Sequence, residues 1–126
     1  MNSLTALFIA MSAQYHLPSG LLASLCYVES KHEVMAIHYA DGKTNSYGVC
    51  QIKYETAQQL GFKGTAKQLM EPKNNIKYAA KYLARQLHRY NGNVNKAVIA
   101  YNRGHAGTLV TTKYQVAVFT EWSNNK

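Results

Sequence analysis

The chain has 126 residues, of which 47% are hydrophobic and only 16% charged, a composition that excludes a disordered chain and fits one compact domain. Fourteen Lys and Arg against six Asp and Glu give a net charge of +8, which favours an anionic partner such as nucleic acid, acidic lipid or a cell wall. No apolar stretch reaches the length of a membrane span, and no repeat or linker divides the chain. We therefore expect a single domain over residues 1–126.

The first thirty residues carry apolar side chains at helical spacing. Residues 3–15 predict a helix rather than a signal peptide, because the apolar run lacks a positively charged start. Pro18 is expected to open a second helix as a first-turn residue. The apolar stripe of that helix comprises Leu21, Leu22, Leu25 and Cys26.

Residues 36–53 differ from the helical segments around them. The polar run at 41–46 lies between short apolar stretches, which predicts a small β-hairpin or a long loop. Further helices are expected at residues 54–60, 65–70, 72–90, 93–103 and 112–122. These elements indicate a mainly α or α+β fold, with a cleft between the helices and the small β element.

The two cysteines, Cys26 and Cys50, both lie in apolar surroundings. We expect two buried free thiols, with a single disulfide as the alternative. No spacing of cysteine and histidine indicates zinc, so no metal site is predicted.

Glu29 is the candidate catalytic residue. It follows Leu22 and Leu25 at helical spacing and should therefore share the apolar face of its helix. Partial burial there would raise its pKa and keep it protonated near neutral pH, the state that a general acid needs. A solvated glutamate at the helix end is the alternative. Ser30 follows directly and can donate a hydrogen bond near the carboxyl group.

A partner carboxylate for Glu29 is not evident among the six acids. Glu33 is expected one helical turn further on, close enough to disfavour ionisation of both, and Asp41 lies in the polar turn. A solvated Glu33 and a turn-forming Asp41 are the simpler interpretations. An enzyme that cleaved a glycosidic bond with Glu29 alone would take its nucleophile from water or from the substrate.

Three short motifs occur in order along the chain: Glu29-Ser30, Gly48-Val49-Cys50-Gln51-Ile52 and Ala100-Tyr101-Asn102-Arg103-Gly104. They resemble the Glu-Ser, Gly-Leu-Met-Gln-Ile and Ala-Tyr-Asn-Ala-Gly motifs of the soluble, goose-lysozyme-like lytic transglycosylases. Asn75-Ile76, Tyr82-Leu83 and the run from Tyr90 to Asn93 also follow that pattern. The resemblance covers residues 4–120 and implies a lysozyme-like α+β fold.

The resemblance also implies roles for individual residues. Glu29 would serve as both acid and base, and Ser30 would orient it or the substrate. Gln51 would bond an N-acetyl sugar, and Tyr101 would place a hydroxyl near Glu29. From the residues alone, Tyr101 also fits a core tyrosine and Gln51 a polar residue satisfied beside the hairpin.

Asn102 joins the expected substrate-binding residues and, with Gly104, shapes the turn after its helix. Tyr47 and Tyr114 either line the cleft or pack in the core. The segment before Gly48 is longer than in the common soluble enzymes, because residues 41–43 are inserted. This feature looks more like the family members attached to phage particles or secretion systems.

The activity implied by the resemblance is cleavage of the β-1,4 bond between N-acetylmuramic acid and N-acetylglucosamine in peptidoglycan. The C6 hydroxyl of the muramyl sugar would act as an intramolecular nucleophile and give 1,6-anhydro ends, with no metal or cofactor required. A hydrolytic lysozyme that holds water with Asp41 or Glu33 is one alternative, and an inactive wall-binding module is another. Nucleic acid is not predicted as a partner, because only residues 73–89 carry a basic stripe, and it fits a solvated or wall-adhering face.

We expect the chain to act at the bacterial cell wall or in the periplasm, as a monomer without a membrane span. It shows no clear signal peptide, so delivery by a phage or a secretion system, or release from the cytoplasm, is expected.

Overall fold

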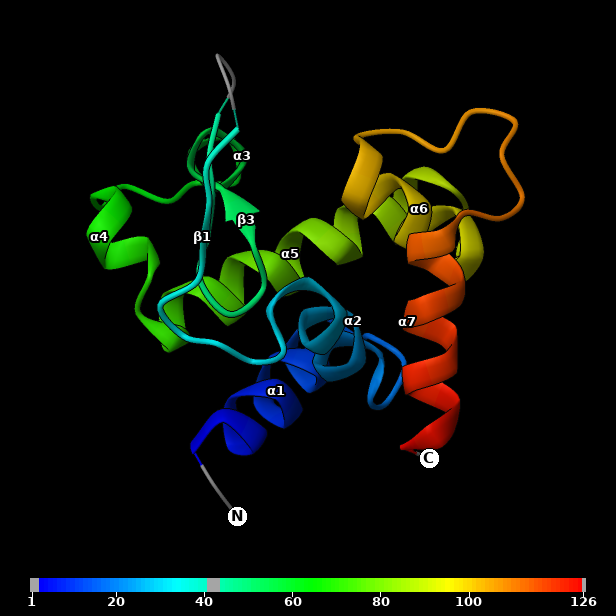
Figure 1. Cartoon of the computed structure of the whole chain (residues 1–126), viewed down its shortest axis with the longest axis horizontal. Helices are drawn as coiled ribbons and strands as arrows, with labels where there is room; N and C mark the ends of the chain where they lie inside the picture. The colour runs from blue at the N-terminus through cyan, green and yellow to red at the C-terminus, as the bar shows by residue number, and fades with distance from the viewer. Residues whose placement is uncertain (1–2, 41–43, 126) are drawn as a thin grey trace.

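The computed structural model describes residues 3–40 and 44–125, which form a helical domain with one small sheet (Figure 1). In chain order the elements are α1 (Ser3–Gln14), α2 (Leu21–Ser30), β1 (Ile37–His38), β2 (Ser46–Tyr47), β3 (Ile52–Lys53), α3 (Tyr54–Gln59), α4 (Ala66–Leu69), α5 (Pro72–Arg89), α6 (Val94–Arg103) and α7 (Lys113–Asn124). The expected mainly α, lysozyme-like architecture is confirmed. Among these residues no helix has both the length and the apolarity that crossing a bilayer requires.

The helix starts follow the local sequence, with one exception. Pro72 occupies the first turn of α5, and Thr65, Asn93 and Thr112 cap α4, α6 and α7 with their side-chain oxygens. The prediction for Pro18 was wrong, because α2 begins only at Leu21. Gly20 precedes it with a φ of 81°, a left-handed conformation that a helix cannot contain, so Pro18 belongs to the turn before the helix.

The segment after α2 folds into three antiparallel strands in the order β1-β2-β3, one strand more than a hairpin. Tyr47 on β2 pairs with Ile37 on one side and with Ile52 on the other. Each strand has two residues, so this sheet depends on the elements around it for its stability. Asp41 lies outside the described residues.

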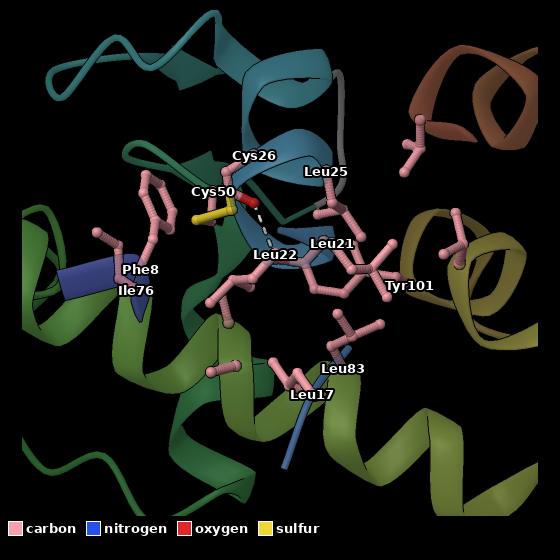
Figure 2. Close-up of a cluster of buried hydrophobic side chains, with 14 of the residues drawn as sticks. Phe8, Leu17, Leu21, Leu22, Leu25, Cys26, Cys50, Ile76, Leu83 and Tyr101 are labelled. Carbon is pink, nitrogen blue, oxygen red and sulfur yellow. Dashed lines mark hydrogen bonds between the residues drawn. A yellow bond between two sulfur atoms is a disulfide. The ribbon is translucent and has the colours of Figure 1, made fainter. Parts of the chain in front are cut away.

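The main core gathers where α5 crosses the centre of the molecule (Figure 1). Helices α1 and α6 pack against α5, and α2 packs against α7. Leu22, Leu25 and Leu83 are fully buried in this core, and Figure 2 shows them pointing toward one another from α2 and α5. A second cluster, built on Ile52 and Leu69, lies under α3 and α4. The apolar face of α2 is thus fixed against the rest of the protein.

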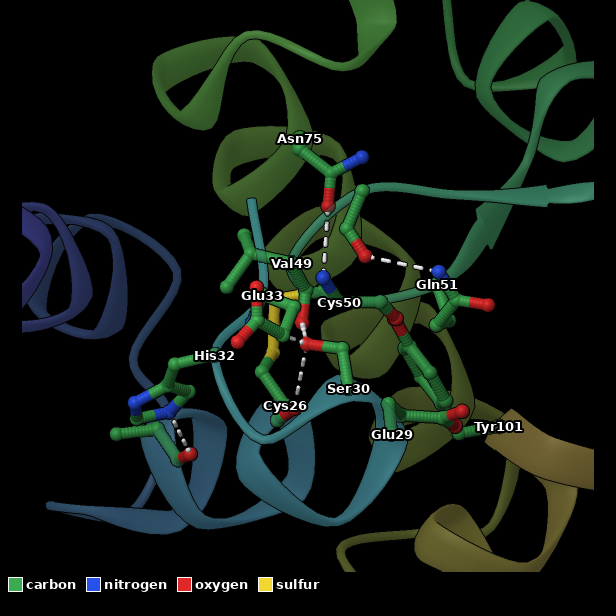
Figure 3. The surroundings of a disulfide bond; sticks show 12 residues. Cys26, Glu29, Ser30, His32, Glu33, Val49, Cys50, Gln51, Asn75 and Tyr101 are labelled. Carbon is green, nitrogen blue, oxygen red and sulfur yellow. Dashed lines mark hydrogen bonds between the residues drawn. A yellow bond between two sulfur atoms is a disulfide. The ribbon is translucent and has the colours of Figure 1, made fainter. Parts of the chain in front are cut away.

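Cys26 and Cys50 are joined by a disulfide, so the expectation of two free thiols was wrong. Both side chains are fully buried, and their Cα atoms lie 4.3 Å apart although 24 positions separate them in sequence. The loop between β2 and β3 folds back onto the last turns of α2. The spacing of residues along the sequence does not predict this contact, because it joins two distant segments. The bond links the helix that carries Glu29 to the loop that carries Gln51 (Figure 3).

Asn75 on α5 holds the same loop from the opposite side. Its buried amide nitrogen donates to the carbonyl oxygens of Tyr47 (2.8 Å) and Leu69 (3.0 Å), and its amide oxygen accepts from the Cys50 N–H at 2.8 Å. Gly48 crosses directly over this amide with a φ of 80°, and a Cβ at that position would lie 2.3 Å from the Asn75 nitrogen. Glycine is therefore required at the first position of the second motif.

Asn75→Ala should destabilise the protein by roughly 3 kcal/mol, because three backbone groups, two of them in buried bonds, lose their hydrogen-bond partner. Asn74→Ala is the matched control, since the Asn74 amide bonds at an exposed position; it should cost less than about 1 kcal/mol. Urea unfolding of both variants measures the difference. Equal losses in the two variants would contradict a special role for Asn75.

Candidate active site

Glu29 lies in the last turn of α2, half-buried at the edge of the main core. Its carboxyl oxygen Oε2 accepts a hydrogen bond of 2.7 Å from the hydroxyl of Tyr114, which α7 supplies from 85 positions further along the chain. The close packing of α2 against α7 makes this contact possible. The predicted partial burial of Glu29 is confirmed.

Burial raises the pKa of Glu29 from its ordinary 4.5 to about 7, and the hydrogen bond from Tyr114 works in the opposite direction. Water solvates a carboxylate better than the surrounding side chains do, so its removal favours the neutral acid. Burial and, to a lesser extent, the nearby carboxylate raise the pKa of the Tyr114 hydroxyl well above its usual range, which keeps it a donor. Glu29 is therefore poised to both give and take a proton near neutral pH.

Ser30 links the end of α2 to the loop that follows β2 through hydrogen bonds of its hydroxyl group. Its hydroxyl lies 2.6 Å from the carbonyl oxygen of Val49 and accepts the N–H of Glu33 at 3.1 Å. These bonds occupy the hydroxyl within the protein, so the structure places Ser30 where it positions the backbone around Glu29 (Figure 3).

Gln51 and Tyr101 meet on the other side of that loop. Gln51 adopts a positive φ of 52° and donates its amide hydrogens to the carbonyls of Ala36 (3.0 Å) and Gly48 (2.9 Å). Figure 3 shows the amide oxygen of Gln51 on the side of the amide away from the hydrogen-bonded nitrogen. Tyr101 is buried, and its hydroxyl donates to the Cys50 carbonyl at 2.9 Å. Thus the tyrosine hydroxyl bonded to Glu29 is that of Tyr114, whereas Tyr101 supports the loop beneath Gln51.

A hollow of about 180 Å³ opens beside these residues. Its walls are Gln51, Ile52, Lys53, Thr56, Tyr82, Tyr101, Asn102, Arg103 and Gly104. Asn102 is exposed at its rim, and Gly104 ends α6 with a φ of 90°, as expected of the turn. The Glu29 carboxyl group lies near Tyr101, one of the wall residues, because its charge acts on the Tyr101 hydroxyl (Figure 3).

A larger hollow of about 700 Å³ lies among α1, α2 and the end of α7. Apolar side chains such as Leu4, Phe8 and Leu17 line it. Glu29 is in the wall of neither hollow. The smaller, more polar hollow has Tyr101 in its wall, and the charge of Glu29 acts on the Tyr101 hydroxyl, so this hollow is the one that lies near the Glu29 carboxyl group. In the described part of the chain, no group of three His, Cys, Asp or Glu side chains is placed to hold a metal ion.

Two other candidates, Tyr47 and Glu33, have surroundings of their own. Tyr47 packs against Ile52 and the rest of the second core cluster, so its ring contributes to the packing of that cluster. Glu33 is not one helical turn after Glu29, because α2 ends at Ser30 and the next two residues have φ values of 55° and 61°. Glu33 is exposed, and burial rather than Glu33 raises the pKa of Glu29. Asp41 cannot be placed, since it falls in the undescribed stretch.

The three motifs therefore converge on one place, where the Glu-Ser pair, the Gly48 loop and the end of α6 meet. The family model described as "Transglycosylase SLT domain" matches residues 6–119. The chain belongs to this family. No solved structure matches the chain significantly. Membership indicates a transglycosylase that acts on peptidoglycan of the bacterial cell wall.

Two important residues of this SLT domain were not recognised as such from sequence. Asn75 gave a usable signal, because an amide beside Ile76 on the apolar face of α5 must find buried partners. Tyr114 was expected either to line the cleft or to pack in the core, but its hydrogen bond to Glu29 was not predicted, since that contact depends on how α7 packs against α2.

The raised pKa of Glu29 makes the stability of the domain depend on pH. The folded protein holds this proton up to a pH of about 7 and the unfolded chain only up to about 4.5, so stability should fall as the pH rises through this window. Glu29→Gln removes that loss and should gain stability relative to the wild type at pH 8, by on the order of 3 kcal/mol at most. At pH 4 the gain should disappear.

Urea unfolding at the two pH values measures this difference. Glu33→Gln is the matched control, because it removes a carboxyl group from an exposed position; its pH dependence should follow the wild type. A Glu29→Gln variant whose stability keeps the wild-type pH dependence would contradict the burial of this carboxyl group.

Tyr114→Phe should raise the pKa of Glu29 further, because the hydrogen bond that stabilises the carboxylate is lost. An NMR titration of the Glu29 carboxyl carbon measures the change. Tyr101→Phe deletes a hydroxyl that bonds Cys50 instead, and it should move the titration less. The reverse order of the two variants would show that Tyr101, rather than Tyr114, controls the proton on Glu29.

Proposed function

We propose that this SLT domain is a lytic transglycosylase that cleaves the β-1,4 bond between N-acetylmuramic acid and N-acetylglucosamine. The observation that carries the proposal is the buried carboxyl group of Glu29, whose pKa of about 7 keeps a transferable proton available at the side of a polar hollow. Glu29 is the catalytic residue of this scheme.

The first step uses Glu29 as an acid. The carboxyl group gives its proton to the glycosidic oxygen while the bond from that oxygen to C1 of the muramyl sugar breaks. The leaving sugar departs with a neutral hydroxyl, and Glu29 becomes a carboxylate. The Tyr114 hydroxyl already donates to Oε2, so it stabilises the negative charge at the moment it forms.

The second step uses the same carboxylate as a base. It takes the proton of the muramyl C6 hydroxyl, and the C6 oxygen forms a bond to C1, which closes a 1,6-anhydro ring. This nucleophile is tethered to the reacting sugar and therefore benefits from a high effective concentration. The proton returns to Glu29, so the enzyme ends the cycle in its starting state.

Gln51 is the proposed contact for an N-acetyl group. Its amide hydrogens are occupied by Ala36 and Gly48, which fixes the orientation of the amide. The amide oxygen, which makes neither of these bonds, is then an acceptor suited to the N–H of an N-acetyl sugar. Asn102, at the rim of the same hollow, is the proposed second polar contact, and Ser30 is a positioning residue.

Hydrolysis of the same bond is the alternative outcome. A hydrolase of this kind needs a group that holds and activates water opposite the acid. Glu33 does not meet that need, because it is exposed beyond the end of α2. Of the two acids that could hold this water, Glu33 is thus unsuited, and Asp41 lies outside the described residues.

The disulfide supports a place of action outside a reducing cytoplasm. Disulfides persist in compartments such as the periplasm and at cell surfaces. The Cys26–Cys50 bond links two parts of the site and is fully buried, so we propose that the domain works as an oxidised monomer at the wall. Delivery with a phage particle or by a secretion apparatus is part of this proposal.

The products from purified peptidoglycan test the proposal. We expect muramyl ends in the 1,6-anhydro form, lighter than hydrolytic ends by one water, in a mass analysis of the released fragments. Glu29→Gln should lower the rate by at least about a thousandfold, because the variant keeps the size of the side chain but has no proton to transfer.

Asp41→Asn and Glu33→Gln are the comparison variants, and each should keep most of the activity. Reducing muramyl ends together with loss of activity in Asp41→Asn would instead identify a lysozyme. A fully active Glu29→Gln would remove Glu29 from the mechanism altogether.

A further inference from the structure

The hollow beside Glu29 carries positive charge in its walls. Lys53 is the last residue of β3, and Arg103 is the last residue of α6. Both side chains line the hollow. None of the nine wall residues is acidic. Within the described chain, neither Lys53 nor Arg103 has a hydrogen-bonding or ion-pair partner for its side chain, so both cations are available to a ligand.

Two further arginines of α5 add to the field at this place. Arg89 donates to the carbonyl oxygen of Gly104 at 2.8 Å, which fixes its guanidinium next to a wall residue of the hollow. Tyr82 forms another part of the wall, and the charges of Arg85 and Arg89 both act on its hydroxyl. The positive potential therefore comes from β3, α5 and α6 together and converges on one hollow.

The volume of the hollow limits what it can hold. About 180 Å³ is well below the size of a pocket for a drug-sized ligand, which is roughly 300–1,000 Å³. It suits one small charged group rather than a whole sugar ring with its substituents. Arg103 stands where the family motif has alanine, so this feature of the wall belongs to this chain.

We propose that the hollow binds a carboxylate carried on the 3-O-lactyl arm of the N-acetylmuramic acid beside the scissile bond. Arg103 can bind a carboxylate with two parallel hydrogen bonds, and Lys53 adds a point charge from the opposite element. The identity of the sugar rests on the proposed function. Where the glycan carries no stem peptide, the carboxylate is that of the lactyl group itself. Where a stem peptide is attached to the lactyl group, the carboxylate is one of that peptide.

Binding measurements in the Glu29→Gln protein test this site without turnover. NMR titrations would compare three tetrasaccharides: one of N-acetylglucosamine alone, one alternating with N-acetylmuramic acid, and the same alternating chain with stem peptides. We expect a carboxylate-bearing tetrasaccharide to bind about three- to tenfold more tightly than the neutral one. Lys53→Gln with Arg103→Ala should remove that preference and leave the affinity for the neutral chain unchanged.

Lys63→Gln with Lys67→Gln is the matched control, because it removes the same charge from exposed positions outside the hollow. This control should keep the preference. Preference for the naked alternating chain assigns the site to the lactyl carboxylate, and preference for the peptide-bearing chain alone assigns it to the peptide. A preference that survives in the Lys53 and Arg103 double variant would overturn the inference, as would equal binding of all three tetrasaccharides.

The outcome is independent of the proposed reaction. Loss of wall cleavage in Glu29→Gln together with an unchanged carboxylate preference in the Lys53 and Arg103 variant would retain the catalyst and reject the carboxylate site. Carboxylate preference in a protein that releases no wall fragments would retain the site and reject the reaction.

Discussion

The loop between β2 and β3 is fixed to three helices at once, and the arrangement of the site depends on this constraint. A disulfide and the Ser30 hydroxyl hold it to α2, the Asn75 amide holds it to α5, and the Tyr101 hydroxyl holds it to α6. The hydrogen bonds from Asn75 and Tyr101 are buried, and the one from Ser30 is partly buried. Strands β2 and β3 have only two residues each and are too short to fix the position of Gln51 by themselves. The disulfide and the hydrogen bonds to the three helices fix it instead.

The electrostatics of the site follow from the same packing. Glu29 belongs to the helix that the loop and α7 both cover, so its carboxyl group loses water from two sides. The hydrogen bond from Tyr114 offsets only part of the effect of burial on the pKa, and the result is a group that titrates near neutral pH. On the open side the cations at Lys53 and Arg103 face solvent, so charge is concentrated where a ligand can reach it.

The sequence predicted those parts of the fold that depend on neighbours along the chain. Capping residues and apolar spacing located α5 and α6 well, and the spacing of Glu29 behind Leu25 correctly indicated a half-buried carboxyl group. The errors concern contacts between distant segments. The return of the loop to Cys26 and the contact of Tyr114 with Glu29 depend on tertiary packing, which periodicity does not encode.

Two local errors have local causes. A left-handed glycine before α2 overrode the preference of Pro18 for a first turn, and left-handed residues after Ser30 turned the chain away before Glu33 could continue the helix. Both concern backbone conformation at a helix end, where short sequence patterns are least informative. The motifs located the site because the fold brings two helix ends, those of α2 and α6, to the loop between β2 and β3.

The disulfide also makes part of the chain a closed covalent ring. The ring runs from Cys26 to Cys50 and contains Glu29, Ser30, β1 and β2. A protease that cuts once inside it, for example after the exposed Lys31, opens the backbone but releases no fragment, because both new ends remain attached through sulfur. In surroundings rich in proteases, the helix that carries Glu29 and the loop that carries Gln51 therefore stay in one molecule after a first cut.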